Sequence, residues 1–104
     1  MSKAIGFLID SACAIPADKI FKAALKHPVY IIDSNVGKLC AINKEVRNKL
    51  GKDEWRFRQY DVLDNLFFFL DDNRVKQCDL VAKIDSRSNI TFSKDHPDLR
   101  KELF

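Results

Sequence analysis

The chain has 104 residues and a mass of 12.0 kDa, a length that provides for one hydrophobic core and one domain over residues 1–104. Hydrophobic residues make up 46% of it and charged residues 32%, a globular balance that excludes disordered and fibrous proteins. Eighteen Lys and Arg against fifteen Asp and Glu give a formal net charge of +3, well short of an obligate nucleic-acid-binding protein.

The cysteine pattern and the short apolar runs indicate the compartment. The longest apolar run, residues 66–70, is far shorter than the roughly 20 residues that cross a bilayer, so we expect no membrane association. Cys13, Cys40 and Cys78 are an odd number without a C-x-x-C pair, which favours reduced thiols and a cytoplasmic protein. Because the chain has two histidines and no ligand spacing typical of zinc, the sequence predicts no bound cofactor.

In chain order, the first two predicted elements are a strand and a helix. Residues 4–9 are continuously apolar and are followed by Asp10, a pattern typical of a buried central strand. A helix begins at Pro16, whose missing N–H has no partner in a first helical turn, and ends at His27 and Pro28. A short loop therefore joins the strand to the helix.

Two pairs of apolar segments, each separated by a short polar turn, are predicted to form β-hairpins: 29–32 with 38–42, and 80–84 with 90–92. Gly37 ends the first turn, and Asn89 takes the corresponding place in the second. Gly and Asn are the residues that most readily adopt the left-handed backbone conformation. Together with the first strand, the two hairpins predict a five-stranded, mainly antiparallel sheet.

Three further helices complete the prediction, over residues 43–50, over residues 54–70 and in a short C-terminal segment that Asp95 caps. The longest of them carries an apolar stripe at helical spacing. The order β-α-β-β-α-α-β-β-α predicts a single compact α+β domain, with the helices packed on one face of the sheet.

The tripeptide Ile-Asp-Ser occurs three times, each time directly after an apolar strand, and its aspartates are Asp10, Asp33 and Asp85. If the three strands ran parallel, these carboxylates would gather at one sheet edge, where they could bind Mg²⁺ for phosphodiester chemistry. The alternative is that Asp-Ser is turn chemistry, because both side chains bond to nearby backbone N–H groups. We favour the turn interpretation, since two copies fall in the predicted hairpins.

The segment 44–60 interleaves basic and aromatic side chains. Guanidinium groups bind phosphates while aromatic rings stack on bases, so this pattern is compatible with nucleic-acid binding. The alternative is a solvated helix in which Trp55 belongs to the core and the arginines pair locally, and we favour it. The candidate nucleic-acid-binding residues are Lys44, Arg47, Lys52, Arg56 and Arg58, and the aromatic residues are Trp55, Phe57 and Tyr60.

Phe67, Phe68 and Phe69 cannot all face one core from a helix, because consecutive helical residues point about 100° apart. At least one ring is therefore expected at the surface, against another chain or under a covering segment. Aromatic residues are enriched at the centres of interfaces. We predict that these three residues, with Trp55 and the other aromatic residues of segment 44–60, bind a protein partner or a second copy of the chain.

Residues 29–51 combine a strand, 29–33, that ends in Asp33 with Gly37, Asn43 and Gly51. This pattern resembles the opening of a PAS sensor domain. In that family a strand ends at Asp, Gly closes the hairpin turn, Asn follows the second strand and Gly ends the next helix. The turn here has one extra residue. The resemblance implies a small-ligand sensor, but it assigns no ligand-binding residue.

The sequence contains no Gly-rich phosphate loop, no Ser/His/Asp spacing and no paired-Glu motif, so it does not predict an enzyme. The expected function is that of a small, non-enzymatic intracellular protein that occupies a macromolecular partner, as inhibitors, immunity proteins and adaptors do. Nucleic-acid binding through segment 44–60, a PAS-like ligand sensor and a nuclease that uses the three aspartates are the alternatives.

Overall fold

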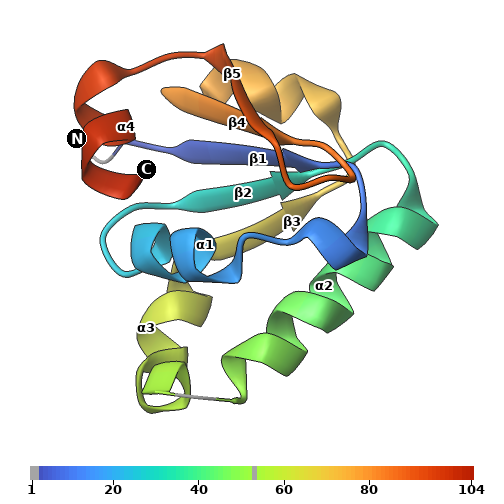
Figure 1. Cartoon of the computed structure of the whole chain (residues 1–104), viewed down its shortest axis with the longest axis vertical. Coiled ribbons are helices and arrows are strands. Elements are labelled where there is room, and N and C mark those ends of the chain that lie inside the picture. Colours follow the sequence, from blue (N-terminus) through green and yellow to red (C-terminus); the bar gives the residue numbers. More distant parts are fainter. Residues whose placement is uncertain (1–2, 53) are drawn as a thin grey trace.

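The computed structural model describes residues 3–52 and 54–104, with the backbone alone for Glu54 and Arg56. One five-stranded mixed sheet forms the centre of this compact α+β domain (Figure 1). The spatial order is β3-β2-β1-β4-β5; β1 pairs in parallel with β2 and β4, β2 in parallel with β3, and β4 antiparallel to β5. The strands are β1 (Ile5–Ile9), β2 (Val29–Ile32), β3 (Leu66–Phe69), β4 (Leu80–Ile84) and β5 (Ile90–Lys94).

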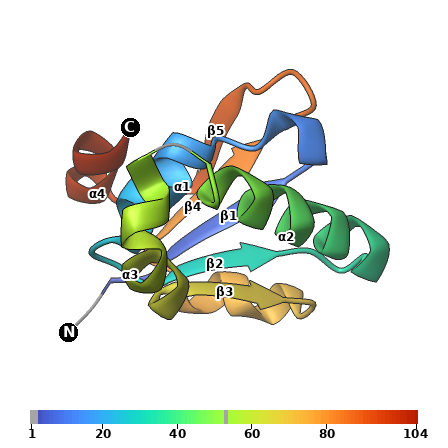
Figure 2. The same ribbon diagram turned by 90° about the horizontal axis from the view of Figure 1, so that it is seen from below.

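The helices cover the two faces of the sheet unequally. In Figure 2, α1 and α2 lie on one side of the strands, and the main core, which also includes residues of α3 and α4, lies on that side. A smaller cluster on the opposite face holds Ile32, Cys78 and Val81, with Val75 of η3 packed against it. The helices are α1 (Ala17–Ala24), α2 (Val36–Leu50), α3 (Gln59–Asp64) and α4 (Pro97–Leu103), and the 3-10 turns are η1 (Ala12–Ala14), η2 (Glu54–Arg58) and η3 (Asp72–Gln77).

The first predicted hairpin is wrong, and so is the mainly antiparallel sheet. Residues 38–42 belong to α2, which begins after Asn35, because the side chain of Asn35 accepts a hydrogen bond from the backbone N–H of Lys38 at 2.9 Å. Gly37 has no left-handed backbone conformation and lies in the first helical turn. The buried residues of α2 recur at helical spacing: Leu39, Ile42, Val46 and Leu50.

The predicted helix over residues 54–70 is also wrong, since it divides into η2, α3 and the strand β3. Asn65 stands at the break: its side chain donates to the carbonyl oxygen of Ala24, and its own carbonyl oxygen accepts from the N–H of Val29. These hydrogen bonds hold Asn65 against the end of α1 and the start of β2. The apolar residues that follow Asn65 pair with β2 as a parallel strand. A third parallel strand therefore replaces the end of the predicted helix.

Three other predictions concern local structure. The buried central strand and the second hairpin are confirmed as β1, β4 and β5. In the hairpin turn the left-handed residue is Ser88, with φ 67°, and not Asn89. The C-terminal helix is capped by His96, whose ring nitrogen accepts from the N–H of Leu99, whereas Asp95 pairs with Arg100. Among the described residues, no helix is long and apolar enough to cross a membrane.

Candidate functional site

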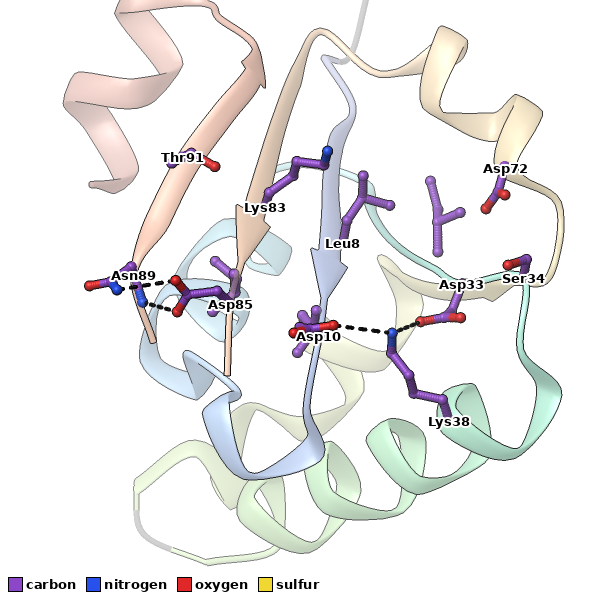
Figure 3. A pocket seen from close by; sticks show the side chains of 13 residues that line it. Leu8, Asp10, Asp33, Ser34, Lys38, Asp72, Lys83, Asp85, Asn89 and Thr91 are labelled. Carbon is purple, nitrogen blue, oxygen red and sulfur yellow. Dashed lines mark hydrogen bonds and ion pairs between the residues drawn. The ribbon is translucent and has the colours of Figure 1, made fainter. Parts of the chain in front are cut away.

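The three Ile-Asp-Ser aspartates, Asp10, Asp33 and Asp85, lie at the same edge of the sheet. Each follows a strand, β1, β2 or β4, and these strands run parallel. All three line one pocket of about 450 Å³ (Figure 3). The sequence left open whether these aspartates converge, and the parallel direction of the strands brings them to one edge.

The pocket coincides with a topological switch point of the sheet. From β1 the chain proceeds outward through β2 to β3, and it then crosses to β4 on the other side of β1. The loops that follow β1 and β4 therefore leave in opposite directions. Ligands of open parallel sheets bind in the crevice that such a reversal creates outside the carboxyl ends of the strands.

A lysine connects two of the aspartates. Nζ of Lys38 lies 3.0 Å from Oδ2 of Asp33 and 3.8 Å from Oδ1 of Asp10 (Figure 3). The Asp33 side chain is 10% exposed and the Asp10 side chain 64%, so the ion pair with Asp33 is the more enclosed. Lys38 reaches this place because Asn35 starts α2 directly beyond the end of β2.

The surroundings of Asp33 keep its carboxylate ionised. Burial alone raises the pKa of this carboxyl. The backbone N–H of Asn35 donates a hydrogen bond to Oδ1 of Asp33 at 2.8 Å, and the ammonium of Lys38 lies beside Oδ2. Together these two groups outweigh burial and lower the pKa of Asp33 below 3.8. The pocket therefore holds a fixed negative charge at the end of β2 throughout the physiological pH range.

Asp85 has the turn role that the sequence suggested. Its carboxylate accepts from the backbone N–H groups of Arg87 and Asn89 and from the Asn89 side chain, at 2.8 to 3.1 Å. The hydrogen bonds from Asn89 are the main reason that the pKa of Asp85 is lowered. This carboxylate lies at the rim of the pocket with most of its acceptor positions engaged.

The rest of the lining comes from segments between β1 and β5. Leu8 and the last residues of β1, β2 and β4 form an apolar floor, and polar side chains of η3, β4, β5 and the loops after β2 and β4 surround it. The apolar residues are Leu8, Ile9, Ile32 and Ile84, and the further polar residues are Ser34, Asp72, Lys83, Asn89 and Thr91.

The low pKa of Asp33 predicts a pH-dependent contribution to stability. We expect Asp33→Asn to lower the free energy of unfolding at neutral pH by about 1 kcal/mol, because the charge-assisted bonds weaken. A lowered native pKa stabilises the fold above 3.8, and the contribution is lost as the pH falls below that value. Urea denaturation at neutral and acidic pH measures this: the two proteins should converge in acid. A difference that persists in acid contradicts the assignment.

No metal cluster accompanies the convergence of the aspartates. Within residues 3–52 and 54–104, no three His, Cys, Asp or Glu side chains lie close enough together to hold a metal ion. Asp10 and Asp33 share the Lys38 ammonium, and Asp85 is engaged in its turn. The structure thus brings the three carboxylates to one pocket without bringing them to one point.

The candidate nucleic-acid-binding residues do not share one continuous helix. Lys44 and Arg47 are exposed on α2, Lys52 follows its end, and Arg58 is exposed at the end of η2. The side chain of Arg56 lies outside the described residues. The segment that was predicted to present all five therefore turns between α2 and α3.

The predicted partner-binding aromatic residues divide into two groups. Trp55 is half-buried with its ring 5.7 Å from that of Phe21, as expected for a core residue, whereas Phe57 and Tyr60 are strongly exposed. The three phenylalanines of β3 alternate between the sheet faces: Phe68 packs against the main core, and Phe67 and Phe69 lie on the opposite face.

Sequence reasoning missed Lys38 and Lys83 as residues of the site. Lys38 was assigned to a strand; its signal was Asn35 three residues earlier, a cap whose helix brings the lysine to the strand ends. Lys83 carried no local signal, because its position in the pocket depends on β4 lying beside β1.

Comparison of the chain with protein-family models, curated proteins and solved structures finds no match.

Proposed function

We propose that the protein binds a small organic amine in the pocket at the carboxyl ends of β1, β2 and β4. The observation that carries this proposal is the pair of carboxylates, Asp10 and Asp33, around the ammonium of Lys38. The same attraction acts on the ammonium group of a ligand once the long, flexible lysine side chain moves aside.

The charge and size of the pocket support this class of ligand. Four aspartates and two lysines line it, which leaves two negative charges. Its volume of about 450 Å³ is typical of sites for small molecules, which range over roughly 300–1,000 Å³. The apolar floor of Leu8, Ile32 and Ile84 provides a surface for the carbon chain of an amine.

A second candidate is the cleavage of phosphodiesters with a divalent cation. The observation that favours it is the position of α2, which begins at the acidic pocket with Lys38 and carries the exposed Lys44 and Arg47 further along. An acidic pocket beside basic side chains suits a cation that activates a phosphate while the lysines and arginines hold the rest of a polyanion. The cation would displace Lys38 and bind to Asp10 and Asp33 alone, since no third His, Cys, Asp or Glu of the described residues lies close enough to complete a cluster.

Apart from the nuclease, the functions expected from the sequence do not depend on the three aspartates of this pocket. Occupation of a protein partner and nucleic-acid binding by segment 44–60 stay predictions, as does a PAS-like sensor. Of these, the sensor is the one that agrees with a small-molecule pocket, although the resemblance assigns no residue to it.

Isothermal titration with putrescine, a diamine, tests the main proposal. We expect Asp33→Asn to weaken binding at least tenfold, since a hydrogen-bonded charge contributes about 1.5–3 kcal/mol. Lys38→Met should strengthen binding, because it removes the internal competitor for both carboxylates. Asp98→Asn on α4, an exposed carboxylate outside the pocket lining, is the matched control and should leave binding unchanged.

Titration with Mn²⁺ and a labelled single-stranded RNA separates the two candidates. Mn²⁺-dependent cleavage that disappears in Asp10→Asn and in Asp33→Asn supports the phosphodiesterase and contradicts the amine site. Putrescine binding without cleavage supports the amine site. If neither probe changes the calorimetric signal or the amide spectrum of Asp33 and Lys38, both proposals are wrong.

A further inference from the structure

The two edge strands of the sheet differ in how they are protected. β5 contains a Lys, and its pairing with β4 has a register shift between Val81 and Ala82, both of which discourage further strand pairing. β3 has neither device: its sequence, Leu-Phe-Phe-Phe, has no charge, no proline and a regular register with β2. Figure 2 shows β3 at the border of the sheet, and within the part of the chain that the structure describes no strand pairs with it on the side away from β2.

The hydrogen bonds to β2 show which backbone groups of β3 face outward. The N–H of Val29 donates to the carbonyl of Asn65, and that of Asp33 to the carbonyl of Phe69. In a parallel pair the residues that bond to a neighbour alternate, so the odd-numbered residues of β3 face β2. The backbone N–H and C=O of Phe68 therefore point outward in the plane of the sheet, away from β2, where one more strand can form hydrogen bonds with them.

An aromatic surface lies beside this free edge. The ring of Tyr30 makes edge contacts with Phe67 at 5.9 Å and Phe69 at 5.1 Å, and the two phenylalanine rings are stacked at 6.3 Å. Phe67 is 40% exposed and Leu70 51%. Side chains of an added strand would cover these rings, because cross-strand aromatic and β-branched pairs stabilise sheets.

Charge distinguishes between the strands that could be added. Asp61 and Asp64 precede β3 and Asp71 and Asp72 follow it, and all four are exposed. In the described part of the chain none of them forms an ion pair. The guanidinium of Arg74 lies over the Phe69 ring, 4.3 Å from its centroid, and so on the face of the sheet rather than along its edge.

If a second copy of β3 paired with this edge, the aspartates at the ends of the two strands would repel one another, whether the strands ran parallel or antiparallel. An antiparallel copy places its Asp71 near Asp64, and a parallel copy places each aspartate near its own equivalent. Like charges at both ends of a pairing strand oppose association. A strand with basic residues at both ends has the complementary pattern.

We propose that β3 is a docking edge for an extended segment of another protein, in which apolar residues alternate between two basic ends. The segment adds a sixth strand to the sheet through the backbone of Phe68. Its apolar side chains cover Phe67 and Phe69, and its basic ends lie beside Asp64 and Asp71. Backbone bonds supply the affinity of such strand addition, and the side chains supply the selectivity.

Three synthetic peptides test this proposal with the intact protein. The first alternates Val and Thr between two lysines at each end, the second has glutamates in place of the lysines, and the third is the lysine peptide with N-methylated central residues. We expect the first to bind at least tenfold more tightly than the other two and to weaken with added salt. Its binding should shift the amide signals of Leu66, Phe68 and Leu70.

Two variants separate pairing at this edge from general attraction. Phe67→Lys adds a repelling charge at an exposed position and should abolish binding, and Asp64→Asn should weaken it. Equal affinity for the lysine and N-methylated peptides would show that strand pairing is not involved. Absence of binding also overturns the proposal, as does concentration-dependent dimerisation that Phe67→Lys abolishes, since the second copy is then the occupant.

Discussion

Phe7→Ala is expected to lower the free energy of unfolding by about 3–5 kcal/mol, the range for truncating a fully buried phenylalanine. Phe7 is 0% exposed in the central strand, and its ring lies 6.1 Å from the ring of Phe104. The substitution leaves a cavity between the sheet and the C-terminal segment, which the helices cannot close without shifting. In a domain of this size such a loss corresponds to a fall in melting temperature of about 12 °C or more.

Tyr60→Ala is the control for this experiment, because the Tyr60 side chain is 77% exposed. Its effect should be within about 0.5 kcal/mol, as for other exposed substitutions. Phe7→Leu should fall between the two. Chemical denaturation of all three variants gives the comparison, and similar losses for Phe7→Ala and Tyr60→Ala would contradict the central position of Phe7 in the core.

Gly6→Ala is expected to destabilise the protein by about 1–3 kcal/mol, through crowding on the other face of the same strand. A Cβ at this position would lie 2.9 Å from Sγ of Cys78 and 3.5 Å from a methyl carbon of Val81. The backbone of Gly6 is not left-handed, so the cost is steric and not conformational. The strand that carries Asp10 to the pocket would be displaced from β4.

Removing the sulfur tests this cause directly. Cys78→Ala alone should cost about 1 kcal/mol, and in combination with Gly6→Ala the total should be smaller than the sum of the single effects. Burial raises the pKa of Cys78 to about 11, so its thiol stays protonated and unreactive in the wild-type fold. Faster alkylation of Cys78 in Gly6→Ala would report the displaced strand, and full additivity would exclude the contact.

The parts of the fold that could be predicted are those decided by neighbouring residues. The continuously apolar run 4–9 predicts a strand that is buried on both faces of a sheet, whichever strands it pairs with. The hairpin of β4 and β5 needs only a short turn between two apolar segments. The role of Asp85 followed in the same way, because an aspartate in a turn bonds to backbone groups close to it.

The errors arose where two local signals competed. Gly37 suggested a hairpin turn and Asn35 a helix cap, and burial of Leu39, Ile42 and Val46 against the sheet decided for the helix. Residues 66–69 are a short apolar run that periodicity cannot assign to helix or strand. Their pairing with β2, more than thirty residues earlier, made them a strand.

The sequence by itself determined that these 104 residues form an α+β fold, that a strand lies at its centre and that three aspartates end apolar segments in turns. The tertiary structure alone decided that β1, β2 and β4 run in the same direction, which brings Asp10, Asp33 and Asp85 to one pocket. Turn chemistry acts over a few residues and is visible in the sequence. Strand direction depends on which distant segments bury one another's apolar faces, and this is settled only when the whole core assembles.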